Sequence, residues 1–182
     1  MARPRIENDL TFARQGTIVE EMVGWQDYDD ATTATTPITL PLADTWYKLT
    51  NDGAGSRSSE EFRVNGKPLI WNTDTSQFYF GDLFIGGMQF LRTSFFVETP
   101  SANTEIEVRL RMAIGSGIDY SIPVYQRYLK AGNKKYQFSP VTFFTIDNPQ
   151  TRDFPAEIQI RADVAGCEVE VDGWKIMTID RY

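Results

Sequence analysis

Carboxylates are the side chains of this sequence most able to do chemistry, because it contains 25 Asp and Glu residues and no His. Histidine is the usual general base and the commonest metal ligand at neutral pH. Its absence excludes Ser-His-Asp and Cys-His catalytic sites and every His-containing zinc site. The sequence therefore favours a protein that binds or builds something over an enzyme, and we assign no catalytic residue, metal ligand or cofactor.

Three carboxylates lie close together in the sequence, on Asp27, Asp29 and Asp30, and such a group could chelate Ca²⁺. The stretch lacks the glycine that gives an established calcium loop its sharp turn. A solvated acidic linker is therefore the preferred interpretation.

Glu105 and Glu107 suggest a second kind of chemistry, because glycosidases hold two carboxylates roughly 5 to 9.5 Å apart across a sugar. Both residues alternate with apolar ones, and they point to the same face as Arg109 and Arg111. Cross-strand ion pairing or a charged subunit contact explains them better than acid–base catalysis. A carboxylate-dependent glycan hydrolase is accordingly the least favoured function.

Aromatic side chains are the other candidate binding groups, because Trp and Tyr can stack on sugars or anchor interfaces. Trp46, Trp71 and Trp174 lie inside strand-like runs, so we expect them to pack in the core. The segment 118–128 differs, because it is loop-like and unusually aromatic. We predict that it forms a subunit or partner interface through Tyr120, Tyr125, Arg127 and Tyr128.

The elements that must position these groups are strands, since alternation of apolar and polar residues dominates from Pro37 onward. The alternation is unbroken over 105–112 and recurs over 156–164. Further strands, rich in β-branched and aromatic residues, are expected at 38–42, 46–50, 61–64, 69–71, 78–80, 89–97, 136–144, 168–172 and 174–179. Asn65–Gly66 and Asp172–Gly173 are typical of tight hairpin turns. No stretch carries a convincing apolar stripe at helical spacing, so the sequence predicts an all-β sandwich, jelly roll or barrel.

Residues 1–36 differ from the remainder of the chain. Three arginines, Arg3, Arg5 and Arg14, precede the acidic, low-complexity stretch 27–36. The segment has too few apolar residues to bury a core of its own. We therefore predict an extended N-terminal arm and linker over 1–36, followed by a single domain over 37–182.

Charge and composition restrict the partners. The formal net charge is −7 and the sequence pI is about 4.7, so no nucleic-acid partner is expected, because binding phosphates usually requires a basic face. No window approaches the roughly 18 apolar residues of a membrane span, so no membrane partner is expected. The single cysteine, Cys167, forms no internal disulfide and fits folding in a reducing compartment.

Three segments carry a resemblance to a known family: 38–55, which reads ITLPLADTWYKLTNDGAG, the region 78–82, and the closing strands 157–182. Together they resemble bacteriophage virion proteins that have a jelly-roll domain like that of tumour necrosis factor. The resemblance covers most of 37–182 and is one of overall sequence character, without a catalytic or metal motif. It implies a jelly-roll (TNF-like) antiparallel β-sandwich.

The resemblance also implies a function and partners. Proteins of this kind include capsid decoration (cement) proteins and head or tail fibre domains, and they are typically trimers. We therefore expect a structural virion protein, assembled in the host cytoplasm, that binds the major capsid protein as a homotrimer. Its N-terminal arm would lie on the capsid, with Arg3, Arg5 and Arg14 meeting acidic groups of the shell. The alternative is a fibre module that binds a receptor or glycan through the aromatic segment 118–128.

Overall fold

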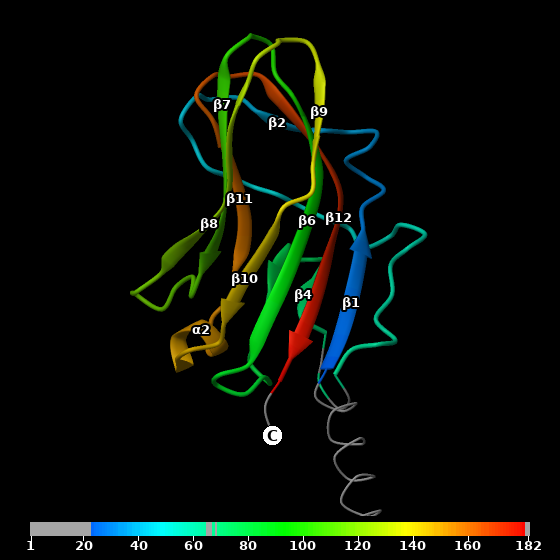
Figure 1. Ribbon diagram of the computed structural model, residues 1–182, viewed down its shortest axis with the longest axis vertical. Helices are drawn as coiled ribbons and strands as arrows, with labels where there is room; N and C mark the ends of the chain where they lie inside the picture. The colour runs from blue at the N-terminus through cyan, green and yellow to red at the C-terminus, as the bar shows by residue number, and fades with distance from the viewer. Residues whose placement is uncertain (1–22, 65–66, 68, 181–182) are drawn as a thin grey trace, which may run out of the picture.

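The computed structural model describes residues 23–64, 67 and 69–180, which fold almost entirely into β-strands (Figure 1). The strands are β1 (Val23–Asp29), β2 (Ile38–Leu40), β3 (Tyr47–Lys48), β4 (Trp71–Asn72), β5 (Gln77–Phe78), β6 (Met88–Glu98), β7 (Thr104–Met112), β8 (Tyr120–Leu129), β9 (Lys135–Phe138), β10 (Val141–Thr145), β11 (Glu157–Ala162) and β12 (Cys167–Ile179). A short helix, α2 (Pro149–Asp153), joins β10 to β11 and begins at Asn148, whose side chain accepts a hydrogen bond from the Thr151 N–H.

Six strands form the first sheet. Its order is β1-β12-β6-β10, with β2 also pairing with β12 and β9 also pairing with β6. The two central strands are long, with 11 residues in β6 and 13 in β12, and their pairing runs from Glu168 opposite Glu98 to Ile179 opposite Met88. This sheet therefore presents a broad outer face, which lies toward the viewer in Figure 1.

Four strands form the second sheet, in the order β3-β11-β7-β8, and all their pairings are antiparallel. The chain passes repeatedly from one sheet to the other: β6 lies in the first, β7 and β8 in the second, β9 and β10 in the first, β11 in the second and β12 in the first. Neighbours within each sheet are therefore seldom consecutive along the chain. Two facing antiparallel sheets connected in this way define a jelly roll, as the sequence predicted.

The core lies between the two sheets and is built from the inward side chains of both. Burial alternates without a break along β7, where the four aliphatics predicted to face inward are fully buried (Ile106, Val108, Leu110 and Met112). Trp71 and Trp174 meet edge to face with ring centroids 5.9 Å apart, and both are buried as predicted. The expected strand at 136–144 is interrupted by Ser139 and Pro140, which separate β9 from β10.

Strand β1 corrects the predicted domain boundary. The sequence assigned 1–36 to an arm and linker, but Val23–Asp29 pairs with β12 over seven positions and forms part of the sheet. The prediction missed this strand because its inward positions are Gly24, Gln26 and Tyr28 rather than aliphatic residues. The buried Gln26 carboxamide is satisfied internally, since its oxygen accepts hydrogen bonds from the Tyr28 hydroxyl and the Ile70 N–H.

Strand β8 corrects the interpretation of 118–128 as a loop. Residues 120–129 form an edge strand paired with β7, and a register shift opposite Val108 and Arg109 leaves Val124 as a bulge. Pro123 is accommodated because an edge strand has one side free of ladder hydrogen bonds. The proline and the irregular spacing made this strand resemble a loop.

Two smaller expectations were also wrong. Asp172–Gly173 is a bulge inside the continuous strand β12 and not a hairpin turn. A Cβ on Gly173 would lie 2.6 Å from the Tyr28 carbonyl oxygen, so glycine permits the close approach of β1 at this point. Residues 61–64 form no strand and instead run beside β1, where the Trp25 N–H donates to the Phe62 carbonyl at 2.8 Å. The Asn65–Gly66 turn lies outside the described residues.

Candidate interaction surfaces

The four side chains predicted to form an interface all lie on β8, but they do not converge on one site. Tyr120 is half-buried, and its hydroxyl lies 2.9 Å from the Thr151 hydroxyl. Tyr125 packs its ring on Phe138 with centroids 5.0 Å apart. Arg127 and Tyr128 are exposed, and Glu105, directly across the ladder, raises the pKa of Tyr128.

The predicted capsid-contact arginines, Arg3, Arg5 and Arg14, lie outside the described residues. Their placement and contacts stay predictions.

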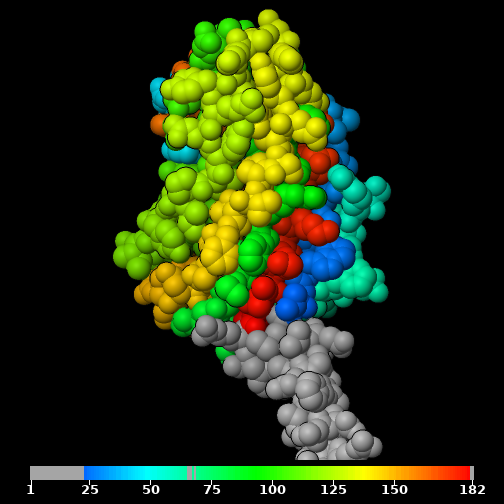
Figure 2. Space-filling view, viewed as in Figure 1, coloured from blue at the N-terminus to red at the C-terminus, as the bar shows by residue number. Residues whose placement is uncertain are grey.

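The outer face of the six-stranded sheet carries an apolar row that the sequence reasoning missed. The register places Trp25 opposite Met177, Met177 opposite Phe90, and Phe90 opposite Phe143. These four residues, the apolar row, cross β1, β12, β6 and β10. Figure 2 shows the side chains of those strands lying side by side across this face. The row was hidden from sequence analysis because its members are separated by tens of residues and meet only through the register.

Further apolar side chains extend the row on both sides. Phe62 stacks on Trp25 with centroids 4.8 Å apart, although it lies in the segment that borders β1. Val23 and Val141 add exposed aliphatic surface at the two edges of the sheet. Exposed apolar residues gathered on one face in this way mark an interaction surface.

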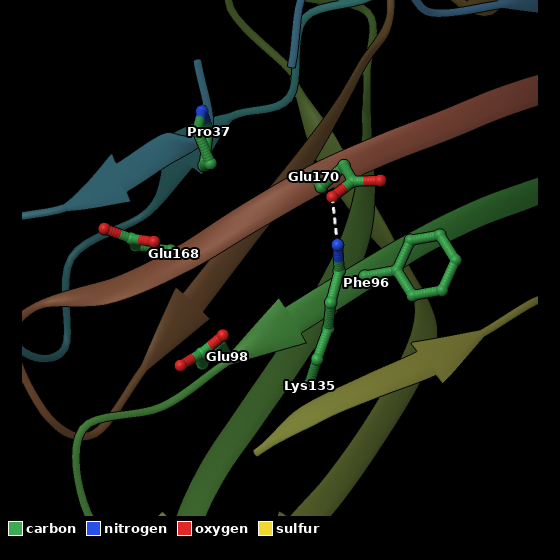
Figure 3. A pocket seen from close by; sticks show the side chains of 6 residues that line it. All are labelled: Pro37, Phe96, Glu98, Lys135, Glu168 and Glu170. Carbon is green, nitrogen blue, oxygen red and sulfur yellow. Dashed lines mark hydrogen bonds and ion pairs between the residues drawn. The ribbon is translucent and has the colours of Figure 1, made fainter. Parts of the chain in front are cut away.

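The other end of the same face is acidic. Glu98, Glu168 and Glu170 surround a shallow hollow of about 50 Å³, and Lys135 pairs with Glu170 (Figure 3). Glu168 lies directly opposite Glu98 in the ladder, where two like charges repel each other. The hollow is too small for more than a water-sized group, so this end of the sheet is a charged border beside the apolar row.

The outer face of the four-stranded sheet is polar and carries several ion pairs. Arg161 pairs with Glu107, and Arg111 pairs with Asp119 at 2.5 Å. The predicted cross-strand ion pairing is confirmed for Glu107, whose pair with Arg161 joins β11 to β7. Glu105 accepts a hydrogen bond from Gln126 at 2.7 Å and completes the network.

Trp46 lies on this polar face and not in the core, which corrects the expectation for it. Its half-buried indole has the Arg109 guanidinium carbon 3.9 Å and the Arg161 guanidinium carbon 5.3 Å from the ring centroid. A hollow of about 250 Å³ lies between Trp46, β7 and β8. The alternation along the strand could have predicted that Trp46 faces outward. Residues two apart in a strand point to the same side of the sheet, and the side chain of Lys48 is directed away from the core.

The acidic stretch that could have chelated Ca²⁺ is held by internal hydrogen bonds instead. The buried Asp29 carboxylate accepts from the Arg57 backbone N–H at 2.7 Å and pairs with the Arg57 side chain at 3.1 Å. The Asp30 carboxylate accepts hydrogen bonds from the backbone N–H groups of Asp52 and Thr33. Asp27 forms an ion pair with Lys175. These carboxylates fix the connection that follows β1, so they are not a solvated linker.

In the described part of the chain, no group of three or more His, Cys, Asp or Glu side chains is placed to hold a metal ion. None of the helices described is long and apolar enough to cross a membrane.

The topology defines this chain as a jelly-roll domain. No protein-family model matches the chain, and no curated protein does. Among solved structures, the chain is similar to Eiger TNF from S. frugiperda, with 8% identity over 88% of this chain and 95% of that one and a TM-score of 0.46. It is also similar to the PRD1 vertex protein P5, with 12% identity over 88% and 96% of the two chains and a TM-score of 0.36.

A third similar structure, dimeric latent PorU from Porphyromonas gingivalis, has 10% identity and a TM-score of 0.47. The similarity covers 87% of this chain but only 13% of PorU. All three TM-scores are below 0.5, so the description of the fold rests on the strand order and pairings of this chain.

Proposed function

We propose that this chain is a structural virion protein of the decoration (cement) class, which binds and stabilises a phage head as a homotrimer. The observation that carries the proposal is the apolar row across the six-stranded sheet. This face is the part of the described surface best suited to a protein partner, and we assign it to contacts between copies of the chain. The number three comes from the family resemblance of the sequence.

The size of the face suits this role. Four strands spaced about 4.8 Å apart, with 11 residues in β6 rising about 3.4 Å each, span roughly 700 Å². Stable interfaces bury about 800 Å² on each partner. A second copy seated on this face would therefore approach the area of a stable interface, with the apolar row at one end of the contact and the acidic group Glu98, Glu168 and Glu170 at the other.

A charge placed in the row tests the subunit contact. Phe143 is 52% exposed, so burying the rest of it would remove on the order of 100 Å² from water, worth about 2.5 kcal/mol. Phe143→Lys should weaken association by about 50-fold or more, which size-exclusion chromatography over a concentration series would measure.

The matched control for that variant is Leu42→Lys, because Leu42 is 61% exposed but lies beyond the end of β2, outside the row. It should leave the elution volume unchanged. Equal behaviour of the two variants would remove the row from the subunit contact.

The N-terminal segment is the proposed contact with the major capsid protein. The test is deletion of 1–22, which stops before β1 because Val23–Asp29 belongs to the sheet. The shortened protein should remain a folded trimer but should no longer sediment with heads that lack the decoration protein. Retained binding would refute the capsid role of this segment, and with it the roles of Arg3, Arg5 and Arg14.

The proposal assigns the chain no catalytic role and places it in the virion. It also leaves β8 outside the subunit contact, because Tyr120 and Tyr125 pack against their own domain. Substituting the exposed Tyr128 by Ala should therefore leave the oligomer unchanged. Dissociation of that variant would instead show that β8 contributes to the subunit interface.

A further inference from the structure

The hollow beside Trp46 has the features of a small ligand site and lies on the sheet opposite the apolar row. Its volume is about 250 Å³, slightly below the roughly 300 Å³ at which ligand pockets begin. Ser121, Pro123 and Gln126 of β8 form one wall, and Trp46 with Arg109 and Glu107 of β7 form another. The Glu107 carboxylate is paired with Arg161. The bulge at Val124 lies in this wall, and such bulges often re-aim side chains beside functional sites.

Arg109 is the unusual residue of this site, because its positive charge has no carboxylate partner. Its Nε donates to the Gln159 carboxamide at 2.8 Å, and its two terminal nitrogens have no hydrogen-bond partner among the described residues. The neighbouring arginines are engaged, Arg111 with Asp119 and Arg161 with Glu107.

The electrostatic surroundings of Arg109 favour a bound anion. Burial lowers the pKa of Arg109, and the positive charges of Arg111 and Arg161 lower it further, while Glu157 and Asp119 only partly offset these effects. An arginine nevertheless stays protonated at neutral pH. A bound carboxylate would offset both the partial desolvation of this cation and its repulsion by the neighbouring arginines. Its two oxygens also match the planar, two-pronged geometry of the guanidinium.

The other groups of the hollow fit a sugar ring. The guanidinium of Arg109 lies against the Trp46 indole, and the free terminal N–H groups leave an in-plane acceptor position open. Trp46 supplies aromatic surface beside the Arg109 guanidinium, whereas Tyr125, which also lines the hollow, packs its ring on Phe138. The exposed Ser121 hydroxyl and Gln126 carboxamide can exchange hydrogen bonds with hydroxyl groups.

We propose that this hollow binds a carboxylate-bearing sugar, such as a uronic or sialic acid residue, whose carboxylate meets Arg109 and whose ring lies against Trp46. The site lies on the outer face of the sheet opposite the apolar row. It overlaps only in part with the aromatic segment 118–128 that was expected to bind a glycan, since Tyr125 lines the hollow and the exposed Tyr128 does not.

The experiment is a titration of the full chain, followed through the indole N–H signals in a nitrogen–proton NMR spectrum. Glucuronate and sialyllactose are the acidic probes, and glucose and lactose are their neutral counterparts. The Trp46 signal is identified from its loss in Trp46→Phe. The proposal expects the Trp46 signal to shift with the acidic probes and those of the buried Trp71 and Trp174 to stay in place.

Variants distinguish specific binding through Arg109 from a non-specific electrostatic attraction to anions. Arg109→Gln should weaken binding of the acidic probes about tenfold or more, because hydrogen bonds to charged groups are the strong ones. Arg109→Lys should restore it only in part, because lysine lacks the fork. Arg152→Gln removes the same charge from α2, at a residue that does not line the hollow, and should change nothing.

Three results would overturn the proposal. One is equal affinity for acidic and neutral probes, which would remove the carboxylate from recognition. Another is an affinity for acetate as high as for glucuronate, which would leave an anion site with no preference for sugars. The third is binding to Arg109→Gln at full strength. None of these results bears on the oligomeric state, so the virion proposal is tested separately.

Discussion

Replacing Gly24 by alanine should push the segment 62–64 away from β1, the edge strand of the six-stranded sheet. A Cβ at this position would lie 2.2 Å from the Val64 nitrogen, 2.6 Å from the Arg63 carbonyl carbon and 2.7 Å from the Phe62 oxygen. All three are backbone atoms, so no side chain can turn away to relieve the contact. The segment 62–64 must therefore retreat from β1 by about an ångström, since ordinary contacts begin near 3.4 Å.

The cost follows from what that segment contributes to β1. Retreat weakens the hydrogen bond from Trp25 to Phe62 and the two between Asp27 and Ser59, which measure 2.8 to 2.9 Å. At about 0.5–1.5 kcal/mol each, together with a similar amount for the Trp25–Phe62 stack, they sum to roughly 2–6 kcal/mol. The lower chain entropy of unfolded alanine returns less than about 1 kcal/mol. We therefore expect a net loss of about 3 kcal/mol.

Urea unfolding followed by circular dichroism measures this loss, at one fixed protein concentration because association stabilises the folded state. The matched control is Gly81→Ala, since a Cβ on Gly81 meets nothing within 4 Å. That variant should be as stable as the parent protein or slightly more stable. If Gly24→Ala and Gly81→Ala unfold at the same urea concentration, then β1 and the segment beside it are not packed as described.

Three further substitutions or treatments give distinct outcomes. The Thr93 hydroxyl is buried with no hydrogen-bond partner among the described residues, so Thr93→Val should raise the free energy of unfolding by about 1 kcal/mol; a lower melting temperature would refute this. Burial alone would raise the pKa of Asp52, but hydrogen bonds from the Thr32 hydroxyl and three backbone N–H groups outweigh it and lower the pKa. The stabilisation is therefore present above the usual value of 3.8 and is lost as the pH falls through the lowered value, so the deficit of Asp52→Asn should shrink in acid; a deficit independent of pH would contradict this. Burial raises the pKa of the Cys167 thiol to about 11, so a thiol reagent should label it only after unfolding, and rapid labelling of the folded protein would show that it is accessible.

The regular parts of the fold were predictable because they follow period two with aliphatic residues. Strand β7 is the clearest case, since its alternation of Glu and Arg with Ile, Val and Leu fixes both the strand and the face it buries. Strands β1 and β8 were not predictable in the same way. The buried positions of β1 are glycine, glutamine and tyrosine, and β8 contains a proline and a bulge. In both strands, tertiary hydrogen bonds and an edge position replace the aliphatic pattern.

The candidate surfaces were harder to predict than the fold, because they depend on register. Trp25, Phe90, Phe143 and Met177 are far apart in the sequence and become neighbours only through three separate strand pairings. Arg109 appeared as one of several charged residues on a solvent face. Its missing partner is visible only when Arg111 and Arg161 are seen to use the nearby carboxylates. The sequence shows which residue types are present, but it does not show which of them become neighbours in the folded chain.

The most direct test of the central claim, that the six-stranded face joins copies of this chain, is the mass of the native protein by multi-angle light scattering. The chain has a mass of 20.8 kDa. The account predicts a particle of three chains that persists on dilution and becomes a single chain in Phe143→Lys. A parent protein that stays a single chain at every concentration would contradict it.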